Sequence, residues 1–97
     1  MSDIIKKKKV NQDELKGLGI DISGWSKWDC EPSEFPWQYD GTETAYVFEG
    51  HVEVTPEGGQ PVIVEAGDLI QFPDGMKCHW KVNQAIRKVY TFTQVNF

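Results

Sequence analysis

The sequence predicts an all-β sandwich or barrel, organised around the stretch from Glu43 to Gly75. Valines alternate within this stretch, as at Val52 and Val54. Glycine and proline residues suited to turns separate the short runs, at Gly50, at positions 58–59 and 67, and in the Pro73-Asp74-Gly75 segment. Short alternating strands at close turn spacing are typical of this fold class.

Composition bounds what the chain can be. Its 97 residues predict one domain, with a barrel over about 33–95 and an N-terminal strand and irregular flap over 1–32. A chain of this size buries enough surface for one core. The net charge of −5 argues against nucleic acid as a partner.

The cellular compartment is inferred from membrane and secretion signals that the sequence lacks. No apolar run reaches the length of a membrane span. The start, MSDIIKKKKV, is not followed by the apolar core and cleavage site of a secretory signal. Cys30 and Cys78 lie far apart and show no metal-type spacing. We therefore expect a cytoplasmic, reduced protein with two free thiols that do not pair with each other.

The N-terminal segment predicts a strand and then a helical turn. The run IIKKKKV at residues 4–10 suits an edge strand whose lysines discourage pairing with other chains. A membrane or anion patch is the alternative, which the acidic balance of the domain disfavours. Asn11 and Glu14 have the spacing of a capping box, and Gly17 can end the turn.

Residues 18–37 combine large aromatic residues with prolines. Trp25, Trp28 and Trp37 fall here, and Pro32 and Pro36 exclude a central strand. We expect an irregular flap, anchored on the barrel by Trp25 and Trp28. An aromatic ligand platform is the alternative, and Trp37 remains a candidate for it.

Two motifs carry a resemblance to the cupins. Glu43, followed six residues later by Gly50, resembles the end of the first cupin motif, and the segment from Gly67 through Pro73-Asp74-Gly75 to Cys78 resembles the second. The chain is most similar to small single-domain, RmlC-like cupins akin to ureidoglycine aminohydrolase and the ethanolamine-utilisation cupin. Its nearest likeness is to their short plant and bacterial members of unassigned activity. The resemblance implies a double-stranded β-helix, or jelly-roll barrel.

The metal ligands of that family do not carry over. The resemblance places Trp37 and Tyr39 where two histidine ligands would stand, and Cys78 where the third would stand, while Glu43 is kept. Two potential ligands fall short of the three that a catalytic zinc site needs. We therefore predict no metal and no other cofactor.

Strand alternation assigns the side chains that face the interior. With Cys78 and Trp80 inward, His79 points outward, and His51 is likewise outward beside Val52.

In the last strand, predicted over 85–95, alternation directs Ile86, Lys88, Tyr90 and Phe92 inward. The same alternation directs Arg87, Val89 and Thr91 outward. An inward Lys88 requires a counter-charge, and Glu43 is the candidate. Lys88 would also favour a reactive thiolate at Cys78.

These inward residues define a candidate pocket. Its predicted ligand-binding residues are Trp37, Tyr39, Glu43, Cys78, Trp80, Lys88 and Tyr90. Polar groups that converge in an aromatic-walled cavity are the usual form of a small-molecule site. The alternative is that they only close a polar barrel inherited from a metal-binding ancestor.

Three functions follow from this pocket. The leading prediction is binding of a small polar molecule without a tightly held metal. The second, implied by the resemblance, is a hydrolase or lyase acting on a small nitrogenous or carbonyl compound, with Glu43, Lys88 and Cys78 as candidate catalytic residues. The third is a structural or interaction module. A homodimer that pairs through the N-terminal strand edge is expected in each case.

Overall fold

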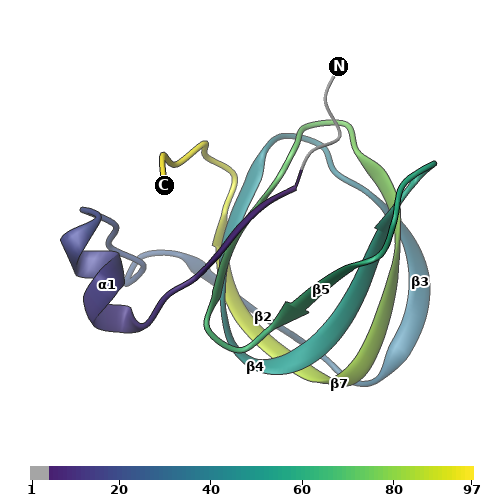
Figure 1. The fold of residues 1–97 in the computed structure, drawn as a ribbon, viewed down its shortest axis with the longest axis horizontal. Helices are drawn as coiled ribbons and strands as arrows, with labels where there is room; N and C mark the ends of the chain where they lie inside the picture. The colour runs from purple at the N-terminus through teal and green to yellow at the C-terminus, as the bar shows by residue number, and fades with distance from the viewer. Residues whose placement is uncertain (1–4) are drawn as a thin grey trace.

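Two long antiparallel strands, β4 and β7, form the spine of the fold. In the computed structural model, which describes residues 5–97, the other strands continue from them into a curved seven-stranded sheet (Figure 1). The elements are β1 (Lys6–Lys9), α1 (Gln12–Gly17), β2 (Ser26–Cys30), β3 (Ser33–Gln38), β4 (Glu43–Pro56), β5 (Val62–Glu65), β6 (Asp68–Phe72) and β7 (Lys77–Thr91). The all-β prediction is confirmed, and the last strand ends at Thr91 rather than at residue 95.

A bulge in β4 lets this one strand keep apolar residues on its inward face both before and after the bulge. Ala45 and Val47 face the core before the bulge, and Val52 and Val54 face it afterwards, so the parity of the inward face changes. Gly50 lies in the bulge at φ +115°, and a Cβ there would lie 2.6 Å from the Cα of Ile86. Glycine is thus required for β7 to approach this closely.

The lysine-rich segment is an edge strand, as predicted. Among the described strands β6 is the one partner of β1, whose four lysines are exposed. The Lys7 and Lys9 ammonium groups reach past the edge to donate hydrogen bonds to the carbonyls of Ile63 and Ala66, at 2.8 and 2.9 Å. Ile4, the first residue of the predicted strand, lies outside the described residues.

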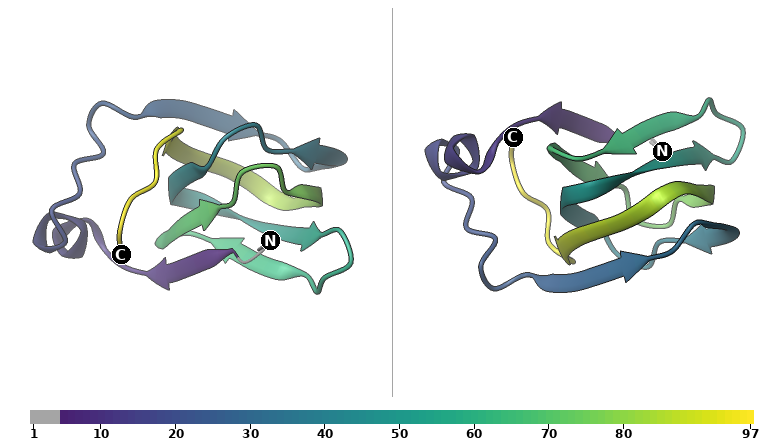
Figure 2. Two further views of the ribbon diagram at one scale, coloured as in Figure 1. Left: turned by 90° about the horizontal axis from the view of Figure 1, so that it is seen from above. Right: turned by 90° about the horizontal axis from the view of Figure 1, so that it is seen from below.

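The helix α1 lies outside the ring of strands, to one side of it (Figures 1 and 2). The predicted capping box is present, because Asn11 and Glu14 each accept a backbone hydrogen bond from the other. A second apolar cluster packs between this helical segment and the outer face of the sheet; its buried members are Val10, Leu15, Ile20, Tyr46, Leu69 and Val89. Val89 therefore points out of the barrel as predicted, yet it is buried.

The prediction of an irregular flap over residues 18–37 is wrong for its second half. β2 and β3 occupy most of this stretch, and both pair with β7. Pro36 lies within β3, which has β7 as its one partner among the described strands, so the missing N–H is tolerated at a sheet edge. Trp25 packs against the outer cluster, as an anchor would.

The described residues contain no helix long and apolar enough to cross a membrane.

Candidate functional site

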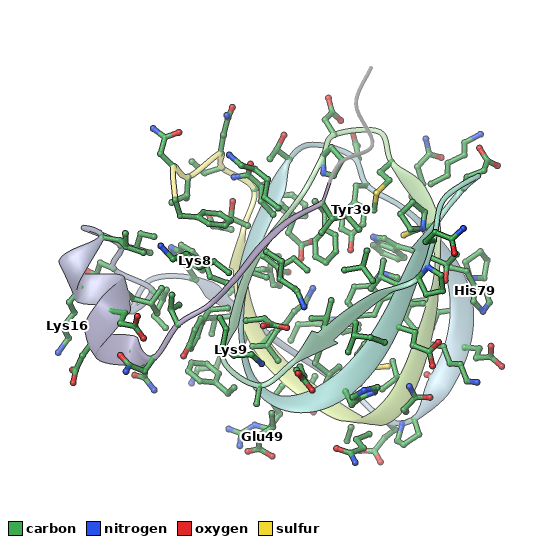
Figure 3. All side chains as sticks on the ribbon, viewed as in Figure 1. Lys8, Lys9, Lys16, Tyr39, Glu49 and His79 are labelled. Carbon is green, nitrogen blue, oxygen red and sulfur yellow. The ribbon has the colours of Figure 1, made fainter. Side chains whose placement is uncertain are left out.

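Alternation along β7 places three chemically distinct side chains on the inner wall of the barrel. Trp80 and Lys88 are buried, and Tyr90 is partly buried on the same face. His79 lies on the other face, outside the ring of strands (Figure 3), where its Nε2 lies 3.1 Å from an oxygen of Glu34. The inward and outward assignments for these four residues of β7 are confirmed.

An ion pair lies at the centre of the interior. The Lys88 Nζ donates to Oε2 of Glu43 over 2.7 Å, and the two side chains are only 6% and 7% exposed. Glu43 begins β4, and Lys88 lies on the neighbouring β7, opposite Val47. The predicted contact between these charges is confirmed. Burial of both charges is tolerated because each supplies the other's counter-ion.

Aromatic rings surround the ammonium group of Lys88. Its Nζ lies 4.9 Å from the ring centroid of Trp80, 5.0 Å from Trp28, 5.6 Å from Tyr90 and 5.8 Å from Phe72. Ring faces carry negative potential and attract cations at such distances. The rings therefore help to hold a charge that the apolar interior would otherwise disfavour.

The rings also fix one another in place. Phe35 stacks on Trp80 with centroids 6.0 Å apart, while Trp28 meets Trp80 edge-on at 5.8 Å. Tyr39 stacks on Phe72 at 4.7 Å. Ring pairs with these geometries stabilise the wall beyond the effect of the area that they bury.

Two buried polar atoms belong to residues of this wall. The Tyr39 hydroxyl and the Trp80 indole Nε1 make no hydrogen bond of ordinary geometry within the described residues, although the indole lies close enough to Tyr39 and to Cys78 to oppose the rise in their pKa values. Figure 3 shows Tyr39 inside the ring of strands. Buried polar groups are normally satisfied, so unpartnered donors beside a cavity indicate where a ligand or ordered water belongs.

Burial changes the ionisation of the interior groups. It raises the pKa of Tyr39 well above 10.0, with a further rise from Glu43, so the phenol stays protonated as a donor. Burial also lowers the pKa of Lys88 from 10.5, and this effect exceeds the opposing effect of Glu43. Both shifts follow from the cost of charge in an apolar environment.

Cys78 differs from its prediction in two respects. Its thiol is free and buried, as expected, but burial raises its pKa to about 11, so a reactive thiolate promoted by Lys88 is wrong. It also does not line the ion-pair cavity, although Glu43 and Trp80, which do, both affect its pKa. With Trp37 and His79 it borders a second, more open groove of about 610 Å³.

The ion pair lies in a cavity of about 300 Å³. The lining residues are Trp28, Phe35, Trp37, Tyr39, Glu43, Trp80, Lys88, Tyr90 and Phe92. Trp37 and Phe92 are 51% and 59% exposed and mark its mouth. The volume is at the lower end of the range for small-molecule sites.

Six of the seven predicted pocket residues line this cavity, and Cys78 does not. Sequence reasoning missed Trp28 and Phe35 as site residues. The alternation of Phe35, Trp37 and Tyr39 was an available signal for a strand with one aromatic face. Phe92, predicted inward, lies at the mouth.

The donor set does not suit the metal that cupins commonly hold. Within residues 5–97 no cluster of three or more histidine, cysteine or acidic side chains exists. The carboxylate of Glu43 is already paired with an ammonium, and indole nitrogen is no ligand. The residues therefore do not fit a metal centre.

Comparison with known proteins identifies the class. The buried core, the curved antiparallel sheet and the inward glutamate are those of a cupin, and a family model described as the EutQ-like cupin domain matches residues 20–90. The chain belongs to this family. No curated protein matches it.

Solved structures support the assignment. A DUF861 family protein from Thermotoga maritima is 43% identical, with a TM-score of 0.84, and the match covers 93% of this chain and 100% of that one. The EutQ protein of Clostridium difficile shares 24% identity over 92% of this chain and 67% of its own, with a TM-score of 0.61. A putative ethanolamine utilization protein Q from Salmonella typhimurium is also 24% identical, over 89% and 64%, with a TM-score of 0.59. The latter two likenesses concern the fold alone.

Proposed function

We propose that this cupin binds a small polar molecule in the cavity around Glu43 and Lys88, without a tightly held metal. The observation that carries the proposal is the pair of buried donors on residues of the cavity wall, Tyr39 Oη and Trp80 Nε1, which make no hydrogen bond of ordinary geometry within the described residues. Leaving such groups unsatisfied costs about 1–3 kcal/mol each. A ligand that accepts hydrogen bonds from them recovers part of this cost.

The polarity of the wall indicates which kind of ligand fits. The Lys88 ammonium has three N–H donors, and within the described residues it donates one hydrogen bond, to Glu43. Tyr39 and Trp80 add an O–H and an N–H donor. The faces of Trp28 and Trp80, which would attract a cation, are already occupied by the Lys88 ammonium. The preferred ligand is therefore a hydrogen-bond acceptor, such as a carbonyl or carboxyl compound, rather than a cation.

Three probes of one shape test this preference. Benzoate, benzamide and benzamidinium share a planar body and differ in charge and in hydrogen-bonding capacity. Titration of each into nitrogen-15-labelled protein, observed through the tryptophan indole N–H signals, reports on the cavity directly. Trp28, Trp37 and Trp80 line the cavity, whereas Trp25 packs in the outer cluster and serves as the internal control.

We expect benzamide or benzoate to shift the Trp80 signal while the Trp25 signal stays in place. Benzamidinium should bind at least about tenfold more weakly than whichever of benzamide and benzoate binds more tightly, which corresponds to about 1.4 kcal/mol. Tighter binding of benzamidinium would contradict the proposal that the ligand is a hydrogen-bond acceptor. No shift of the Trp28, Trp37 or Trp80 signals with any probe would contradict the binding site.

A further inference from the structure

We infer that Lys88 is a covalent attachment site that forms a reversible imine with a small aldehyde or ketone. The inference rests on the proposed binding cavity and names its ligand class more narrowly, as a reactive carbonyl compound. It is carried by the position of the Lys88 amine: on the wall of an aromatic cavity, with one carboxylate as its hydrogen-bond partner.

A lysine amine must be unprotonated before it can attack a carbonyl carbon. An exposed lysine with a pKa near 10.4 is neutral in roughly one molecule in 2,500 at pH 7. The rings that attract the Lys88 ammonium also exclude water from it, and loss of water is the usual way that proteins activate a lysine nucleophile. Burial lowers its pKa, in the direction that such chemistry requires.

Glu43 can accept and return the protons that imine formation requires. Its Oε2 lies 2.7 Å from Nζ and can accept the ammonium proton, which leaves a neutral amine beside a carboxylic acid. The neighbouring Tyr39 and Cys78 do not compete for this role, because burial raises their pKa values and keeps them protonated.

The reaction then balances in two steps. The Nζ lone pair forms a bond to the carbonyl carbon, the C=O π pair moves to oxygen, and the nitrogen's proton transfers to that oxygen to give a carbinolamine. The acid proton of Glu43 next transfers to the hydroxyl group, the C–O bond breaks, and water leaves. The resulting iminium loses its nitrogen proton to Glu43, so that amine and carbonyl have become imine and water.

Eight other lysines provide a comparison within the same molecule. Lys81 is the matched control, because it lies on β7 with Lys88 but is exposed on the opposite face. Benzaldehyde, which shares the body of the benzamide probe, is added at low concentration with cyanoborohydride. This reductant delivers hydride to the iminium carbon and fixes the adduct as a secondary amine. Peptide mapping by mass spectrometry then gives the labelling rate at each lysine.

We expect the Lys88 peptide to be labelled at least about tenfold faster than the Lys81 peptide, because the Lys88 amine is desolvated and lies beside a carboxylate that can take its proton. In denaturant the two rates should become equal. Lys88→Arg should remove the fast adduct and Lys81→Arg should not. The wild-type comparison needs no variant, so a Lys88→Arg protein that fails to fold leaves the test intact.

The outcomes separate the two proposals. If Lys88 is labelled no faster than Lys81, the imine proposal is wrong. A benzamide-induced shift of the Trp80 signal would then show that the binding proposal still holds. Fast labelling of Lys88 supports the imine even where benzamide produces no shift, in which case the non-covalent acceptor site is wrong. Slow labelling together with no shift overturns both.

Discussion

The buried ion pair should behave as one energetic unit, and a double-mutant cycle measures this. The perturbations are Lys88→Met, Glu43→Gln and the two combined. At 2.7 Å and an effective dielectric constant of ~20, the Coulomb attraction is about 6 kcal/mol, much of which offsets the desolvation of the two ions. Removing one member of such a pair costs about 3–5 kcal/mol, because the other charge stays buried and unpaired.

The surrounding rings make the two single changes unequal. After Glu43→Gln the ammonium still lies near four ring faces, which stabilise a cation. After Lys88→Met the carboxylate remains beside those faces without a counter-charge. Lys88→Met should therefore cost the most, about 3–5 kcal/mol, and Glu43→Gln less. The double variant should recover much of the loss.

An exposed pair on the same two strands provides the control. Arg87 on β7 contacts Glu49 on β4 at 2.6 Å, but these side chains are 64% and 59% exposed. The double-mutant cycle of this exposed pair, with Arg87→Met and Glu49→Gln, should give a coupling free energy of no more than about 1 kcal/mol.

Urea denaturation followed by tryptophan fluorescence gives the free energy of unfolding for each protein. Additive effects at Glu43 and Lys88, or a coupling no larger than in the control pair, would refute the reasoning.

Three further predictions concern the thiol, the metal and the assembly. The pKa of Cys78 is about 11 when folded and near 9.0 when unfolded, so its contribution to stability should be lost as pH rises between these values. Burial shifts the pKa of Lys88 in the opposite direction, but this contribution is the same in the wild type and in Cys78→Ala. In parallel urea titrations the wild type should therefore lose more stability over that range than Cys78→Ala. Elemental analysis of untagged protein, purified without chelators, should find no stoichiometric transition metal; one equivalent per chain would contradict the donor-set argument. Light scattering at micromolar concentration should give the mass of a dimer, and a mass near the 11.1 kDa monomer would contradict it.

Local patterns predicted the centre of the candidate site well. Residue parity along one strand is enough to place Lys88 on the same face as Trp80 and Tyr90, and the cupin motif places Glu43 inward. Because an inward lysine needs a counter-charge, the contact between the two could be predicted without a structure, and it is present.

The wall of the site was less predictable because it depends on long-range strand pairing. Trp28 lies opposite Lys88 only because β2 pairs with β7, and nothing near Trp28 in the sequence indicates that register. Prolines favoured an irregular flap, yet an edge strand tolerates Pro36. Cys78 was assigned to the cavity from its place in the cupin motif and from parity, but these give the face of a strand and not the position along the barrel.

A crystal structure of the protein with benzamide tests the central claim most directly. The binding proposal predicts density for the probe inside the barrel, with its carbonyl oxygen about 2.7–3.2 Å from Lys88 Nζ or from one of the unpartnered donors of Tyr39 and Trp80. A cavity that holds only water while the probe saturates the crystal would contradict it.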